Sequence, residues 1–114
     1  MNSISCLIQA DGSAAGREAE LEQKLRDHHG AQCSGAEVAV SWRAVASDRM
    51  FTAGATSKTS VIACEVDGPT SRDQREAYMR GVCDLWTETT GCSDHDVVVS
   101  MTEAVQAAST EETS

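Results

Sequence analysis

Apolar and polar residues alternate at the start of the chain. Over residues 3–10, Ile4, Cys6 and Ile8 fall on one face of an extended segment, which stops at Asp11-Gly12. A period of two is typical of a β-strand with one buried face. Residues 59–66 form a second apolar run that also stops at Asp-Gly. We therefore predict a strand at each of these two places.

Two longer segments carry apolar residues at helical spacing. The first runs from about Ser13, a candidate cap, to His29, and Gly30 is expected to end it. The second begins near Ser71, which has capping-box spacing to Gln74, and ends at Gly91. The predicted buried stripes are Ala14, Leu21, Leu25 and His28 in the first helix, and Tyr78, Val82, Leu85 and Thr89, with Trp86 beside them, in the second.

One sequence pattern occurs twice. Residues 33–42 and 92–101 both read Cys-Ser-x-x-acid-Val-x-Val-Ser followed by a large apolar residue, at an offset of 59. Each copy is a turn that leads into a β-branched strand, over about 37–45 and 96–101. The repeat predicts two strand–helix–strand units in the order β-α-β-β-α-β. Each unit is expected to be a right-handed parallel crossover.

The expected fold class is α+β, with two helices covering one face of a four-stranded mixed sheet. The other face stays apolar at residues such as Ala39 and Ala63, so we expect another subunit to cover it. The long connection 46–58, with a candidate short strand at 50–52, is expected to be functional or part of an assembly contact. We predict one domain over residues 1–105 and an acidic Ser/Thr/Ala tail over 106–114, disordered or docked on a neighbour.

Composition narrows the classes of partner. The chain has 114 residues and a net charge of −9, which disfavours nucleic acid and anionic membranes. No run of 18 apolar residues and no signal peptide is recognisable, so we expect a cytoplasmic protein. The five cysteines form no Cys-x-x-Cys pair, and the turn around His95 is expected to be solvated. No disulfide framework, metal or cofactor is therefore expected.

The element order, the internal repeat, the long loop before the third strand and the ending of the fourth strand together resemble the tautomerase superfamily. The resemblance covers roughly residues 2–103 and is greatest to the cis-3-chloroacrylic acid dehalogenase and 4-oxalocrotonate tautomerase-like proteins. It implies a homotrimer, or an assembly with a paralogous subunit, and a small carboxylic acid as ligand. It also implies an amino-terminal proline as general base.

The catalytic residues that the resemblance implies match this chain unevenly. Asn2 stands in the place of the proline and cannot be a base. Because its bulk disfavours removal of Met1, the α-amine of Met1 becomes an alternative base or Schiff-base amine. His29 matches a histidine of the dehalogenase group, and Glu111 aligns with a glutamate in its tail. Met1, Asn2, His29 and Glu111 are thus the candidate catalytic residues.

The substrate-binding positions depart further from the family pattern. The paired arginines of the dehalogenase group fall on Asp67 and Thr70, so that Arg72 is the only nearby substitute. The tyrosine on the fourth strand falls on Ser100. Arg43, on the second strand, is a further candidate for holding a carboxylate. Arg43, Arg72 and Ser100 are therefore the candidate binding residues.

Three functions remain open on the sequence. The first is a divergent tautomerase or isomerase that moves a proton on a small keto or unsaturated carboxylic acid. The second is a non-catalytic tautomerase-fold subunit or ligand-binding trimer. The third is a ferredoxin-like binding domain, which shares the element order but pairs its strands differently.

Overall fold

The protein is described from a computed structural model, which covers residues 2–33, 35–46, 51–52, 55–56, 59–68 and 70–103. The elements in chain order are β1 (Ser3–Gln9), α1 (Glu18–Gln32), β2 (Ala39–Val45), β3 (Phe51–Thr52), β4 (Ala55–Thr56), β5 (Ser60–Val66), α2 (Arg72–Thr90), a short 3-10 helix (Asp94–Asp96) and β6 (Val97–Glu103). No described helix is long and apolar enough to cross a membrane.

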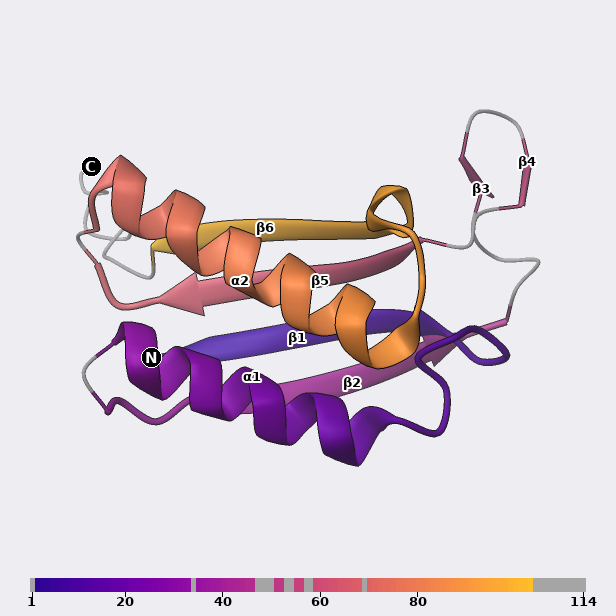
Figure 1. The fold of residues 1–114 in the computed structure, drawn as a ribbon, viewed down its shortest axis with the longest axis horizontal. Coiled ribbons are helices and arrows are strands. Elements are labelled where there is room, and N and C mark those ends of the chain that lie inside the picture. The colour runs from indigo at the N-terminus through magenta and orange to yellow at the C-terminus, as the bar shows by residue number, and fades with distance from the viewer. Residues whose placement is uncertain are drawn as a thin grey trace, which may run out of the picture.

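The main sheet has four strands in the order β2-β1-β5-β6 (Figure 1). β1 pairs with β2 in parallel, β5 pairs with β6 in parallel, and β1 pairs with β5 in antiparallel. The two strands of each strand–helix–strand unit are therefore neighbours. Ferredoxin-like domains place another strand between them, so this topology excludes the ferredoxin-like alternative.

The strand pairing agrees with the internal repeat. Ile4 pairs with Val40 in the first unit, and Ile62 pairs with Val99 in the second. The repeated Val-x-Val-Ser segments thus form the beginnings of the outer strands β2 and β6, with Val38 directly before β2. The two strands that end at Asp-Gly, β1 and β5, lie side by side at the centre. The predicted α+β class and four-stranded mixed sheet are confirmed.

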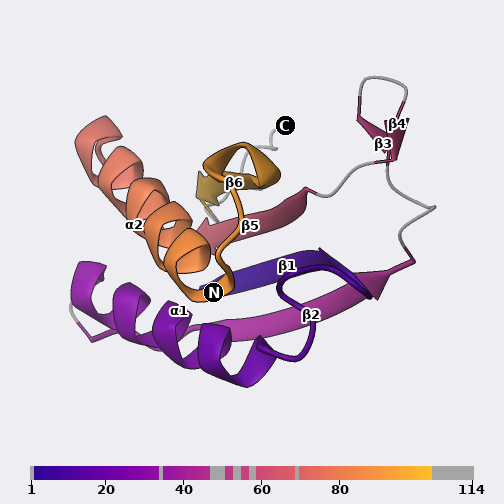
Figure 2. The same cartoon turned by 45° about the vertical axis from the view of Figure 1, so that its right-hand side comes forward.

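Both helices lie on one face of the sheet (Figure 2). They bury the inward side chains of the two central strands, because alternate residues of β1 and β5 point toward them. The core consists of Ile4, Cys6, Ile8, Ala14, Leu21, Leu25, Val38, Ile62, Cys64, Tyr78, Val82, Trp86 and Val97. No described helix covers the opposite, outward face.

The second helix begins and ends as predicted. Ser71 accepts a hydrogen bond from the backbone of Gln74, whose side chain accepts one from the backbone N–H of Ser71. Gly91 takes the left-handed conformation (φ 76°) that closes a helix C-terminus. Trp86 is fully buried within the stripe, whereas Leu85 is only half-buried.

The first helix differs from the prediction at both ends. It begins at Glu18, not near Ser13, because residues 13–16 form turns and Gly16 has φ 84°. It continues through Gly30 to Gln32, since a glycine inside a helix costs only about 1 kcal/mol. Its buried histidine is His29, while His28 is half-buried. The predicted buried stripe thus ended on His28, whereas the buried residue is the next one, His29.

The long connection contains a small hairpin of β3 and β4, which lies apart from the main sheet in both views (Figures 1 and 2). The short strand predicted at 50–52 is present as Phe51–Thr52, and Met50 lies outside the described residues. The tail 106–114, and with it the predicted domain boundary, also lies outside them. That boundary stays a prediction.

Candidate functional site

Asn2 connects the two halves of the sheet through its side-chain amide. Its Nδ2 donates a hydrogen bond to the carbonyl of Glu37 (3.3 Å), and its Oδ1 accepts one from the backbone N–H of Asp67 (2.9 Å). The backbone N–H of Ala39 also donates to the carbonyl of Asn2 (3.2 Å). Asn2 is therefore a structural bridge between the start of β2 and the end of β5. Met1 lies outside the described residues.

The loop after β5 is held by a carboxylate at the end of β6. Glu103 Oε2 accepts hydrogen bonds from the backbone N–H (2.6 Å) and the hydroxyl (2.8 Å) of Thr70. Arg75 Nη1 lies 3.5 Å from the same oxygen. These donors, first Thr70 and then Arg75, hold the pKa of Glu103 below its ordinary value. Gly68 packs so closely that an added Cβ would lie 2.9 Å from Glu103.

Both arginines near the start of α2 are paired with carboxylates. Arg72, the candidate substitute for the missing arginines, is 82% exposed and lies 3.0 Å from Glu76. Arg75 pairs with Glu103 and donates to the carbonyl of Thr70 (2.7 Å). Asp67 and Thr70, onto which the resemblance would place the arginines of the dehalogenase group, carry no positive charge in this chain. An incoming carboxylate would thus meet two arginines that already have carboxylate partners.

His29, the candidate catalytic histidine, is fully buried between the helices and the sheet. Its Nδ1 lies 2.7 Å from the Tyr78 hydroxyl and 3.9 Å from the sulfur of Cys33. Burial, followed by the nearby charge of His28, lowers the pKa of His29. Its Nε2 has no hydrogen-bond partner within the described part of the chain. The imidazole is therefore a neutral group of the core at neutral pH.

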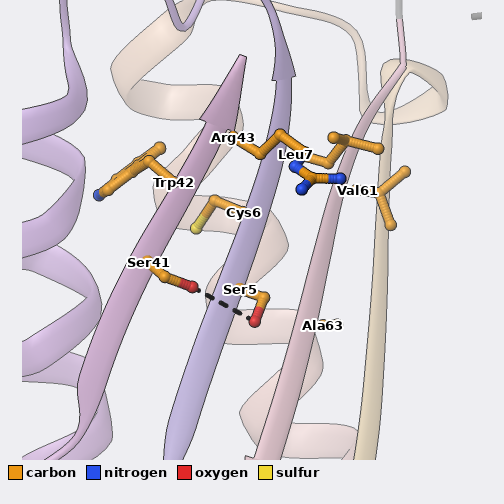
Figure 3. Close-up of a pocket in the computed structure, with 8 residues that line it drawn as sticks. All are labelled: Ser5, Cys6, Leu7, Ser41, Trp42, Arg43, Val61 and Ala63. Carbon is orange, nitrogen blue, oxygen red and sulfur yellow. Dashed lines mark hydrogen bonds between the residues drawn. The ribbon is translucent and has the colours of Figure 1, made fainter. Parts of the chain in front are cut away.

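A groove of about 470 Å³ runs along the outward face of the sheet (Figure 3). Arg43 extends from β2 across β1 toward Leu7 and Val61, and Ser41 donates a long hydrogen bond (3.4 Å) to Ser5. Ser100 is exposed on β6, where it pairs in register with Ala63 of the same face. The groove is lined by Ser5, Cys6, Leu7, Ser41, Trp42, Arg43, Val61 and Ala63.

The predicted site residues therefore fall into two groups. The start of β1, the end of α1 and the start of α2 lie at one end of the molecule (Figure 1). Asn2 directly precedes β1, His29 is in the last turn of α1, and Arg72 is the first residue of α2. Arg43 and Ser100 belong to the outward sheet face. Glu111 lies outside the described residues, so its role rests on the sequence alone.

The structure adds contacts that sequence reasoning did not predict. Glu103 holds the loop after β5, and Tyr78 bonds the buried imidazole. An acid at the end of the last strand and a tyrosine in a buried helical stripe were the available signals, since a buried hydroxyl normally finds a partner. Neither signal identifies the partner, because the contacts are 33 and 49 residues apart in sequence.

Two further kinds of site can be assessed from the thiols and acids. Among the described residues, no group of three or more His, Cys, Asp or Glu side chains could hold a metal ion. Burial raises the pKa of Cys6 and of Cys64 to about 12, so these thiols stay protonated at neutral pH. They act as small apolar residues of the core.

Neither a protein-family profile nor a curated protein sequence matches this chain. Solved structures do. Native Ps01740 has a TM-score of 0.84 and 19% identity, covering 93% of this chain and 96% of its own. A member of the cis-3-chloroacrylic acid dehalogenase (cis-CaaD) family has a TM-score of 0.81 and 15% identity, covering 89% and 73%. A wild-type fused 4-OT, solved as a symmetric trimer, has a TM-score of 0.78 and 14% identity, covering 87% and 82%.

These similarities confirm the predicted resemblance at the level of the fold. The chain shares its fold with the cis-CaaD family member over 89% of its length and with the fused 4-OT over 87%. At such low identities the fold alone is established.

Proposed function

We propose that this protein is a self-assembling tautomerase-fold subunit whose amino-terminal end serves structure instead of proline-dependent proton transfer. The observation that carries the proposal is the use of both ends of the Asn2 amide. Its donor and its acceptor bind Glu37 and Asp67, which belong to different repeats. A residue that joins two strand ends in this way has a structural reason to be Asn.

The charges near the start of α2 also support a structural role for this end of the molecule. Arg72 and Arg75 are paired with Glu76 and Glu103. The family chemistry, as the resemblance implies it, needs cations that hold a small carboxylate beside the base. Here a carboxylate would have to displace a side chain that is already bound, at an entropic and desolvation cost.

Self-assembly is the second part of the proposal. The outward face of the sheet has no described helix over it, and Val98 is 50% exposed there. A similar solved structure, the fused 4-OT, is a symmetric trimer. We propose that three copies of this chain, or copies with a paralogous subunit, cover one another's sheet faces.

The experiment is a ketonisation assay on phenylenolpyruvate and a simple 2-hydroxy-2,4-dienoate, with wild type and an Asn2→Pro variant. Intact mass establishes whether Met1 is present in each. We expect wild type to show only the non-enzymatic rate. A gain of activity in the proline variant alone would show that the base was the missing part. Saturable turnover by wild type would overturn the proposal.

A second candidate is the divergent isomerase itself, acting on a small keto or unsaturated carboxylic acid. The structural similarity to a cis-CaaD family member favours it. In this case Met1 or another group replaces the proline, with His29 and Glu111 assisting, and Arg43, Arg72 or Ser100 holds the substrate. Wild-type turnover whose KM rises in Arg43→Ala or Arg72→Ala would support this candidate.

A further inference from the structure

The outward face of the sheet is unusually poor in charge for so acidic a chain. The net charge is −9 over 114 residues, yet most side chains on this face are small and neutral. Alternation along the four strands assigns to it Ser3, Ser5, Leu7, Gln9, Ala39, Ser41, Arg43, Val45, Val61, Ala63, Glu65, Val98, Ser100 and Thr102. Small side chains let a second surface approach the strands closely.

The two charged residues among these described positions have opposite sign. Arg43 is exposed on β2, and Glu65 is exposed on β5. Within the described part of the chain, neither has an ion pair. As far as the described residues go, both charges are left to solvent or to a molecule that covers the face.

Arg43 and Glu65 cannot readily pair within one copy. Arg43 is level with Leu7 on β1, whereas Glu65 is level with Ser3. Four residues of strand separate these levels, which is about 13 Å. In addition, β1 lies between the two strands. Figure 3 shows Arg43 reaching over Leu7 and Val61, at its own end of the face.

We infer that Arg43 of one copy forms an ion pair with Glu65 of a neighbouring copy when the sheet faces assemble. The face carries one positive and one negative charge at opposite ends, so it is complementary to itself. In a closed ring each copy gives its Arg43 to one neighbour and its Glu65 to the other. The inference rests on the proposed self-assembly and names the contact that sets its register.

A second copy fits this face better than a small carboxylate does. A lone carboxylate would satisfy Arg43 but would leave Glu65 and the exposed Val98 uncovered. A second copy covers the neutral small residues and supplies both missing charges at once. Charge pairs of this kind contribute mainly to specificity and to the exclusion of wrong arrangements.

Charge reversal tests the inference directly. At the contact between copies, Arg43→Glu brings two negative charges together and Glu65→Arg brings two positive charges together. The double variant restores opposite charges in the swapped order. Sedimentation of the four proteins over a concentration series gives the dissociation constant of the assembly. We expect each single reversal to raise it by at least about tenfold, and the double variant to return to within about threefold of wild type.

Matched controls separate this contact from overall charge. Arg80→Glu and Glu88→Arg make the same changes in net charge at exposed positions of α2, on the other side of the sheet. They should leave the dissociation constant unchanged. Raising NaCl from about 0.05 M to about 1 M should weaken the wild-type assembly and have less effect on an Arg43→Gln, Glu65→Gln double variant.

The outcomes are distinguishable. Equal assembly of wild type, both single reversals and the double variant overturns the ion pair but leaves self-assembly intact. A monomeric wild type overturns both.

If a single reversal fails to fold, the neutral variants Arg43→Gln and Glu65→Gln replace it. Their two losses should then not add in the double variant, and additive losses would contradict the inference. Pyruvate binding to wild type and to Arg43→Glu is measured by NMR. If Arg43→Glu still assembles but no longer binds pyruvate, Arg43 would be assigned to a small carboxylate instead.

Discussion

Asn2 and Asp67 are 65 residues apart in sequence, and the side-chain Oδ1 of Asn2 accepts a hydrogen bond of 2.9 Å from the backbone N–H of Asp67. The same amide donates to the carbonyl of Glu37. The side chain next to the amino terminus thus joins the two repeats.

Asn2→Ala should destabilise the fold. It removes two hydrogen bonds that are each worth about 0.5–1.5 kcal/mol, so a loss of about 1–3 kcal/mol is expected. Urea unfolding of wild type and variant gives the difference. Asn2→Asp is the matched control, because it retains the acceptor for Asp67 but cannot donate to Glu37; it should lose part of the stability. An Asn2→Ala protein as stable as wild type would contradict the bridging role.

His29 should make folding stability depend on pH. Burial lowers its pKa from the ordinary value of 6.5, so the unfolded chain binds this proton more tightly than the folded chain. Stability is then complete above about pH 6.5 and decreases as the pH falls below it.

Urea midpoints from about pH 8 to about pH 5 measure this dependence. His29→Phe should flatten the curve over this range. A slope unaltered by His29→Phe would contradict the role of His29.

Gly81 allows the two helices to pack at His28. A Cβ at Gly81 would lie 2.2 Å from His28 Cε1, and His28 Nε2–H donates to the carbonyl of Tyr78 (3.0 Å). Gly81→Ala would ordinarily favour a helix by about 1 kcal/mol. Here overpacking should destabilise the fold by about 1–3 kcal/mol.

The pair His28→Ala with Gly81→Ala is the matched test. Removing the ring gives the new methyl group space, so the double variant should be more stable than His28→Ala alone. Thermal unfolding of the three variants measures this coupling. A Gly81→Ala protein more stable than wild type would show that the His28 ring moves aside at little cost.

Cys6 and Cys64 should resist thiol reagents in the folded protein. Both are 2% exposed, and burial raises the pKa of each to about 12, so very little thiolate forms at pH 8. The half-buried Cys33, Cys83 and Cys92 should react first with an aromatic disulfide reagent. Cys6 and Cys64 should react only as fast as the core opens. Peptide mapping by mass spectrometry identifies the order. Early labelling of Cys6 would contradict the described core.

The main helices and strands could be predicted well from the sequence, because they depend on local periodicity and on an internal repeat. The alternating Ile4, Cys6 and Ile8, the capping box at Ser71 and the left-handed Gly91 are short-range signals that the folded chain keeps. The start of the first helix was misplaced, since a turn through Gly16 outweighed the capping signal at Ser13.

The contacts at the site join residues far apart in the sequence, and they could not be predicted from the sequence alone. His29 was identified as a candidate, but its burial against Tyr78 follows from how two helices pack. The pairing of Thr70 with Glu103 depends on the loop after β5 meeting the end of β6. Arg43 was predicted to hold a carboxylate, and only strand register shows that Glu65 shares its face.

The most direct test of self-assembly is the native molar mass of the wild-type protein, measured by light scattering over a range of concentrations. A trimer of the 12.1 kDa chain has a mass of about 36 kDa, and this is the mass we expect. A mass of 12.1 kDa at every concentration would leave the outward sheet face uncovered and would contradict self-assembly.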